Sequence, residues 1–185
     1  MKLNKNFLKG YLNSTGPVGF EYELGAQKIW MDRISKFTKS VELDNYGTAY
    51  AVTGNLDSDY KVVIEAHCDE ISWFVNYIDK KGYIKVIKNG GSDAMIAPSM
   101  RVNLWGDKGV VSGVFGHPAI HITDRKKESD INSIFIDVGA SSKEEVEKMG
   151  INVGTVVTFK DEFMELGKKY YTGRALDNRI GGYMI

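Results

Sequence analysis

The residues best suited to chemistry lie in the stretch EAHCDEIS at 65–72, where a histidine and two acidic residues directly follow an apolar run. Residues 61–66 have the composition of a β-strand, so His67 and Asp69 are expected to point to the same side at its carboxyl end. Ligands bind at that edge of open α/β sheets. A neutral imidazole binds zinc and similar divalent ions, and a neighbouring carboxylate can bind the ion or hold the other ring N–H. A metal ion would explain why polar side chains follow a strand that is expected to be buried.

The pair His67 and Asp69 also has a simpler interpretation, as a hydrogen-bonded pair at a strand end without metal. Metal sites need three or four ligands, and an H-x-D pattern supplies one or two. A second candidate is Asp177, in GRALDNR at 173–179. Because it precedes a helical pattern, Asp177 by itself is typical of a helix N-cap. Neither pattern identifies a metal site by its own residues.

Cys68 is the remaining reactive side chain. As a nucleophile it would need a histidine base, for which His117 and His121 are the candidates. On a strand, Cys68 would point away from the side that carries His67 and Asp69, into the core. We therefore interpret Cys68 as a core residue, and His117 and His121 as loop and strand residues rather than ligands.

The elements that must position these residues are helical at first and then stranded. Residues 1–40 have the apolar periodicity of helices, broken once by the turn-forming stretch 13–17. Short strands are expected at 41–43, 48–52 and 61–66. The end of the chain, 177–185, looks like the first turns of a helix without a C-terminal signal, and it suggests a fragment of a longer domain.

A β-rich block is expected between these parts. Short strands separated by Gly-containing turns indicate a small barrel or sandwich rather than βαβ units. Ser142 and Glu145 have capping-box spacing for a helix that ends at Gly150. A β-rich block at 72–160 between two parts of another kind is the pattern of one domain inserted in another. The strands are expected at 72–78, 83–87, 101–105, 110–115, 120–122, 134–138 and 155–160.

Composition excludes several classes of protein. The hydrophobic content of 43% and charged content of 26% are ordinary for a soluble globular protein. Basic and acidic residues number 24 each, so no net field attracts the chain to nucleic acid or anionic lipid. No segment approaches the roughly 18 apolar residues of a membrane span, and a single cysteine excludes an internal disulfide framework. We predict a cytoplasmic protein.

Seven segments, in order along nearly the whole chain, resemble the M42 family of metalloaminopeptidases, relatives of the glutamyl and deblocking aminopeptidases. Each is weak by itself, but seven in register are specific, and the sixth is particularly close. Cys68 replaces the usual Met and Ser72 the usual Gly, and neither is a ligand position. The segments are STGPVGFE (14–21), DNYGTAYAV (44–52), VVIEAHCDEIS (62–72), NGGSDAMIAPSMRVNLWG (89–106), GVVSGVFGHPAIH (109–121), IFIDVGASSKEEVEKMGINVGTVVTF (134–159) and GRALDNRIG (173–181).

The resemblance implies an α/β fold and a mechanism. It implies a zinc-peptidase-like α/β/α catalytic domain, incomplete in this chain, at 1–71 and 161–185, with an inserted small β-barrel oligomerisation domain at 72–160. His67 resembles the ligand of one metal, Asp69 the aspartate that orients that histidine, and Asp177 the carboxylate that bridges two divalent ions, zinc or cobalt. The implied reaction is hydrolysis of the N-terminal peptide bond of peptide substrates by a metal-activated water, in homo-oligomers that build from dimers to dodecamers.

The resemblance also implies what is missing. Relatives continue beyond position 185 and supply a Glu–Glu pair, a further acidic ligand and a late histidine. We therefore expect the 185-residue chain alone to be inactive. An alternative is a non-catalytic oligomerisation module with a vestigial metal site. A glycoside hydrolase is a third reading, but it needs two carboxylates that flank a sugar bond and no metal, which fits the pattern of His67, Asp69 and Asp177 poorly.

Overall fold

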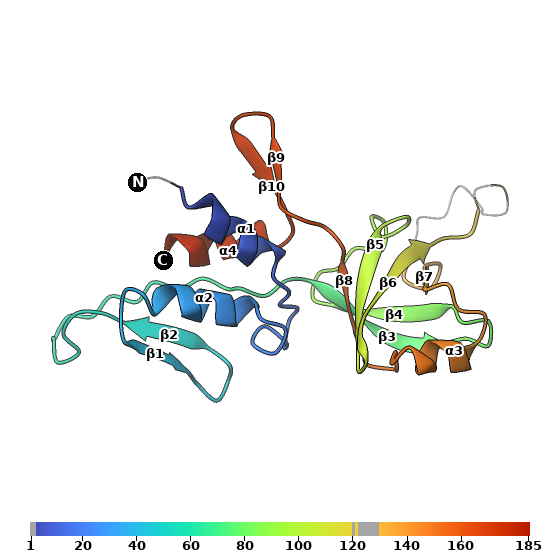
Figure 1. Cartoon of the computed structure of the whole chain (residues 1–185), viewed down its shortest axis with the longest axis horizontal. Coiled ribbons are helices and arrows are strands. Elements are labelled where there is room, and N and C mark those ends of the chain that lie inside the picture. The colour runs from blue at the N-terminus through green and yellow to red at the C-terminus, as the bar shows by residue number, and fades with distance from the viewer. Residues whose placement is uncertain (1–2, 120, 122–129) are drawn as a thin grey trace. The chain divides into compact units, whose positions relative to one another are not determined.

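The computed structural model describes residues 3–119, 121 and 130–185, which form two compact units (Figure 1). Unit 1 consists of Met1–Glu70 and Glu162–Ile185, and unit 2 of Ile71–Asp161. The fold is mixed α/β, and unit 2 contains a closed six-stranded barrel. Among the described residues, no helix is both long enough and apolar enough to cross a membrane.

Unit 1 is built from short helices and two hairpins. The Asn4 side chain caps the first helix, because its Oδ1 accepts a hydrogen bond from the Phe7 N–H at 3.1 Å. The indole N–H of Trp30 donates to the Gly182 carbonyl at 3.0 Å and ties the second helix to the last one. The elements are α1 (Lys5–Asn13), α2 (Ala26–Ile34), β1 (Ser40–Leu43) paired with β2 (Ala49–Val52), β9 (Met164–Leu166) paired with β10 (Tyr170–Thr172), and α4 (Leu176–Met184).

The strand expected at 61–66 is not formed, and this prediction was wrong. Residues 61–69 belong to no helix, strand or turn. The side chains of Val62, Val63 and Ile64 are 69%, 85% and 71% exposed. A continuous apolar run of this kind is typical of a strand buried on both faces. The described part of the chain places neither a neighbouring strand nor a covering layer against it, so the run has nothing to pair with.

Unit 2 is the barrel indicated by the β-rich pattern. Its strands close in the order β3-β4-β7-β6-β5-β8, with every pairing antiparallel, and closure through the β8–β3 pair decides between barrel and sandwich. His121, expected in a strand, lies in a turn, and the neighbouring positions 120 and 122 lie outside the described residues. The strands are β3 (Ser72–Ile78), β4 (Ile84–Asn89), β5 (Arg101–Gly106), β6 (Gly109–Gly116), β7 (Phe135–Asp137) and β8 (Val156–Phe159).

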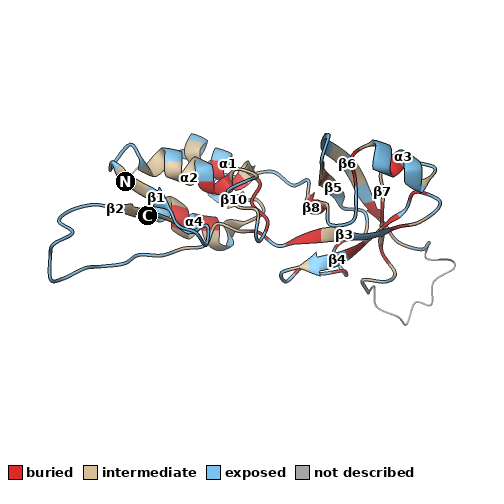
Figure 2. Ribbon diagram, turned by 90° about the horizontal axis from the view of Figure 1, so that it is seen from below, coloured by how far each residue is buried: buried red, intermediate tan, exposed pale blue. Residues whose placement is uncertain are grey.

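The barrel encloses the core of unit 2, where buried residues follow the strands (Figure 2). Trp73 is fully buried and makes edge contacts with Phe115 and Phe159, at ring-centroid distances of 5.3 and 6.3 Å. The predicted helix is present as α3 (Lys143–Lys148), and its N-cap Ser142 accepts a hydrogen bond from the Glu145 N–H. This unit therefore has a core of its own.

Candidate metal site

The predicted site residues of unit 1 lie together. The Nδ1 atom of His67 is 2.8 Å from Oδ1 of Asp69, and its Nε2 atom is 3.1 Å from Oδ1 of Asp177. His67 therefore lies between two carboxylates, one two positions away and the other 110 positions away in the sequence. The side chains are 54%, 31% and 95% exposed in the order His67, Asp69 and Asp177, so the Asp177 face of the site is open to solvent.

Asp177 is not a helix N-cap, which corrects the interpretation favoured from its position alone. The helix α4 begins at Leu176, and Ala175, with φ of 58°, occupies the N-cap position. Asp177 and Asn178 have non-helical backbone angles, and the peptide bond between them is cis. Among the described residues, the carboxylate of Asp177 has its hydrogen-bonding contact with His67, whose Nε2 lies 3.1 Å from Asp177 Oδ1.

Glu70, directly after the His67 segment, is buried and pairs with two arginines. Its carboxylate accepts hydrogen bonds from Arg174 Nε at 2.5 Å, from Arg179 Nη2 at 3.3 Å and from the Gly16 N–H at 3.0 Å. Burial lowers the pKa of the Arg179 guanidinium, and the Glu70 carboxylate opposes that shift. Sequence reasoning missed this cluster, although both arginines flank Asp177 in GRALDNR and Glu70 follows Asp69.

Cys68 is a poor nucleophile in this setting. Burial raises the pKa of its thiol to about 11, although the nearby Arg179 guanidinium acts in the opposite direction. The thiolate is therefore a very small fraction at neutral pH. His117, one of the two candidate bases, has its Nδ1 2.9 Å from the Pro118 carbonyl in unit 2. The interpretation of Cys68 as a structural residue is favoured.

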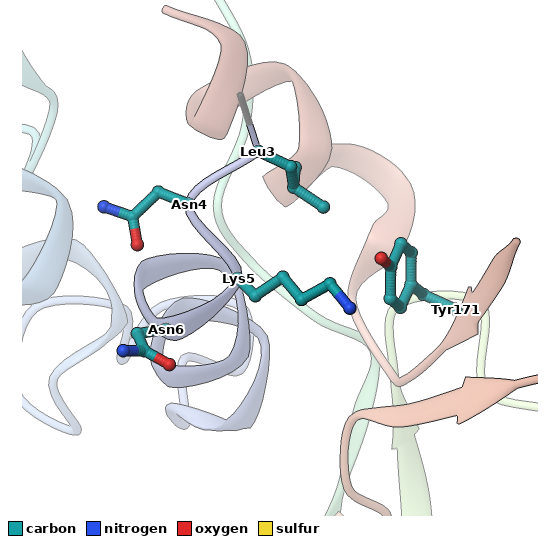
Figure 3. Close-up of a pocket in the computed structure, with 5 residues that line it drawn as sticks. All are labelled: Leu3, Asn4, Lys5, Asn6 and Tyr171. Carbon is teal, nitrogen blue, oxygen red and sulfur yellow. The ribbon is translucent and has the colours of Figure 1, made fainter. Parts of the chain in front are cut away.

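A pocket elsewhere in unit 1 has a different character. It has a volume of about 440 Å³ and is lined by Leu3, Asn4, Lys5, Asn6 and Tyr171 (Figure 3). The Lys5 side chain extends toward the Tyr171 ring, and its ammonium lies 3.1 Å from the Glu165 carboxylate. The only cation among these lining residues, Lys5, is therefore paired with Glu165 at the exposed surface.

The donor set around His67 fits part of a metal site. Tetrahedral zinc with bonds of about 2.0–2.1 Å places neighbouring ligand atoms about 3.3 Å apart, close to the 3.1 Å between His67 Nε2 and Asp177 Oδ1. Asp69 on Nδ1 matches the carboxylate–histidine arrangement that fixes the orientation of metal-binding imidazoles. No group of three or more His, Cys, Asp or Glu side chains suited to a metal ion occurs within residues 3–119, 121 and 130–185. The described residues therefore supply two donors.

Comparison with known proteins is decisive for the family. The model of the M42 glutamyl aminopeptidase family matches residues 47–185. The chain belongs to the M42 peptidase family. It is 33% identical over 182 residues to the lysyl aminopeptidase of Pyrococcus furiosus, a match that covers 96% of this chain and 52% of that protein. The predicted family membership is confirmed.

Two solved structures match the fold of this chain. The TET aminopeptidase from the marine sediment archaeon Thaumarchaeota archaeon SCGC AB-539-E09 has a TM-score of 0.88 at 28% identity, over 96% of this chain and 50% of that one. PhTET1-12s, solved as a dodecamer in the asymmetric unit, has a TM-score of 0.85 at 27% identity, over 98% and 53%. The chain thus spans about half the length of the relatives it matches.

Proposed function

We propose that this chain carries part of the metal centre of an aminopeptidase that removes N-terminal residues from peptides. The observation that carries the proposal is the position of His67 between Asp69 and Asp177 in a member of a family of aminopeptidases. The proposed cofactor is a pair of divalent ions, zinc or cobalt, as the family resemblance implies.

The proposed roles are those that the family resemblance implies, and the contacts of each side chain are compatible with them. His67 would hold one ion through Nε2, and Asp69, 2.8 Å from Nδ1, would accept the Nδ1–H and so keep Nε2 available for the metal. The resemblance implies that the Asp177 carboxylate, which has two oxygens and is 95% exposed, would bind both ions. When bound, such ions lower the pKa of a water molecule and polarise the substrate carbonyl. The resemblance implies that a glutamate from beyond position 185 moves the proton.

The proposed catalytic domain is of the zinc-peptidase-like α/β/α kind, formed by residues 1–71 and 161–185 together with a further polypeptide half. The exposed Val62, Val63 and Ile64 support this, because such a run is suited to a central sheet position. Burying the three side chains would stabilise the completed sheet by roughly 1.5–3 kcal/mol each at full burial. The proposed partner of the run is a strand from the half that the matched relatives have in addition.

We also propose that residues 72–160 form an inserted oligomerisation domain. Unit 2 has its own closed barrel and its own core. A domain with its own core can fold as a separate unit and present an interface to other subunits. PhTET1-12s, solved as a dodecamer, supports a homo-oligomer of this chain's parent, and the family resemblance implies that it is built from dimers. Sedimentation velocity tests this directly, since a monomeric complete protein would contradict it.

The competing function is a non-catalytic module with a vestigial metal site. Native mass spectrometry separates the two, because the complete protein is expected to hold about two ions per chain as an enzyme and none as a module. A glycosidase remains a poor fit, because the site pairs one histidine with two carboxylates rather than presenting two carboxylates across a sugar bond.

The proposal is tested with aminoacyl-anilide substrates. We expect the purified 185-residue chain to be inactive even after addition of Zn²⁺ or Co²⁺, since its described residues supply two donors. The complete protein should hydrolyse them, lose activity in EDTA and regain it with metal. A complete protein that is folded and metal-loaded but inactive on a panel of anilides would contradict the aminopeptidase assignment.

A further inference from the structure

We propose that Arg179 is a positioning residue that holds His67 and Asp177 at the separation a metal ion requires, and that Glu70 and Arg174 hold Arg179 in turn. This inference rests on the proposed metal-binding function of the same site. It concerns residues that no part of that function uses directly.

The need for such a residue comes from the backbone that carries His67. Residues 61–66 have no backbone hydrogen bond to another described residue, so no sheet fixes the segment that leads to His67. Asp177 lies where the helical backbone of α4 is interrupted. Neither side chain is therefore positioned by regular secondary structure, and other contacts must set the 3.1 Å between them.

Arg179 supplies these contacts from a fully buried position, with 0% exposure. Its Nε donates to the carbonyl of Cys68 at 2.7 Å. Cys68 follows His67 directly, and Arg179 lies two positions after Asp177. One guanidinium group therefore joins the two backbone segments that carry His67 and Asp177.

The rest of the guanidinium is anchored to the end of α1. Nη1 donates to the carbonyls of Tyr11 at 3.0 Å and Ser14 at 2.6 Å, and Nη2 donates to Glu70 at 3.3 Å. The last carbonyls of a helix have no partner within the helix, so they are natural acceptors for a buried cation. Arg179 thus fixes the site relative to α1, which gives the site a rigid reference.

Glu70 closes the network. Its backbone N–H donates to the Gly16 carbonyl at 2.9 Å and its own carbonyl accepts from the Val18 N–H at 3.2 Å, so the chain just after His67 is tied to 16–18. Its carboxylate binds Arg174 as well, and Arg174 Nη2 also donates to the Asn13 and Ser14 carbonyls. The two arginines share one carboxylate and one helix end.

Lysine cannot replace Arg179 here. A planar guanidinium presents five N–H groups in fixed directions, and those of Arg179 reach Cys68, α1 and Glu70 at the same time. A lysine ammonium has three donors on one atom and cannot span these acceptors. Arg179→Lys keeps the positive charge but removes the planar set of N–H donors. It therefore tests whether Arg179 acts by positioning its neighbours.

The experiment compares Arg179→Lys with Leu8→Ala, a destabilised control in the buried face of α1 that donates no hydrogen bond to the network. Two readouts are taken by NMR on the 185-residue chain below its unfolding temperature. The first, without metal, is the NOE between the His67 ring proton Hε1 and the Asp177 β-protons. The second is the apparent Kd for Co²⁺ added stepwise, followed at the His67 ring signals, which His67→Ala identifies by their absence.

We expect Arg179→Lys to lose the NOE and to weaken Co²⁺ binding by about 10- to 100-fold, as is usual for residues that orient metal ligands. Leu8→Ala should keep both. A folded Arg179→Lys chain that keeps the NOE overturns the proposal, and so does a Leu8→Ala chain that loses it. If Arg179→Lys does not fold, the same two readouts are taken on Arg174→Lys. We expect a smaller loss of NOE intensity and of Co²⁺ affinity in that variant. An unchanged NOE and Kd would count against the proposal.

The two readouts separate this proposal from the proposed function. If the wild-type chain shows the NOE but binds no Co²⁺, metal binding by the described residues is contradicted. The positioning role of Arg179 is then still tested by the NOE, which is measured without metal. A wild-type chain that binds Co²⁺ through His67, with Arg179→Lys binding it equally well, contradicts positioning alone.

Discussion

Replacing Glu70 by glutamine should strongly destabilise unit 1. Glu70 is 5% exposed and is the carboxylate shared by Arg174 and the fully buried Arg179. Glu70→Gln keeps an oxygen for the Gly16 N–H but removes the negative charge, so the buried Arg179 guanidinium loses its ion-pair partner. Breaking a buried ion pair from one side costs about 3–5 kcal/mol, because the remaining charge stays desolvated. That is a large share of the roughly 5–15 kcal/mol that holds a typical domain folded.

Glu165→Gln is the matched control. Glu165 also pairs with a cation in unit 1, but both it and Lys5 are about half exposed. Exposed ion pairs contribute little, because water and salt already screen them. The same chemical change should therefore leave the stability of unit 1 nearly unaltered when it is made at the surface.

The assay is native-state hydrogen exchange with no denaturing salt added. It measures the exchange rate of each backbone amide separately. Amides of α1 and α4 report on unit 1, and amides of the barrel strands β3–β8 in unit 2 serve as the internal reference. We expect Glu70→Gln to accelerate exchange in α1 and α4 and to leave the barrel unchanged. A loss of less than about 1 kcal/mol in unit 1, or an equal effect of Glu165→Gln, would refute the reasoning that this buried pair supports the site.

Two further predictions test other parts of the structure. Gly106→Ala should destabilise the barrel by about 1–3 kcal/mol, because an added Cβ would lie 2.5 Å from the Gly150 carbonyl oxygen. Gly91→Ala should leave the stability nearly unchanged, because its added Cβ would have no atom within 4 Å. Urea denaturation of both variants measures the two losses of stability, and equal losses would contradict the packing argument. Alkylation of Cys68 by iodoacetamide should be slow at pH 7 and should rise about tenfold per pH unit toward its pKa of about 11, because only the thiolate reacts. A rate that levels off near pH 8.5 would show an unperturbed thiol.

Local patterns predicted much of the fold because they depend on neighbours in sequence. Apolar periodicity located α1 and α2, and alternation with Gly-containing turns located the barrel strands to within a few residues. The spacing of Ser142 and Glu145 located the start of α3. The helices and the neighbouring strand pairs β3–β4 and β5–β6 are stabilised by contacts within one segment or with the adjacent one, whereas β7 and β8 also pair with strands that are distant in the sequence.

The failures have the opposite origin. Residues 61–66 have the composition of a strand, yet a strand exists only where another strand pairs with it, and the described residues provide none. Asp177 has the type and position of an N-cap, but its carboxylate faces a histidine 110 positions away. The Glu70–Arg179 pair spans 109 positions, so no local pattern reveals it. The three-residue strands β9 and β10 are too short to show a periodicity.

The most direct test of the metal centre is a crystal structure of the protein grown with Zn²⁺, with anomalous data collected at the zinc absorption edge. We predict an anomalous peak within about 2.0–2.2 Å of both His67 Nε2 and a carboxylate oxygen of Asp177, with Asp69 still hydrogen-bonded to Nδ1. A zinc-loaded crystal in which no peak contacts His67 and Asp177, or in which the two side chains remain directly hydrogen-bonded to each other, would contradict it.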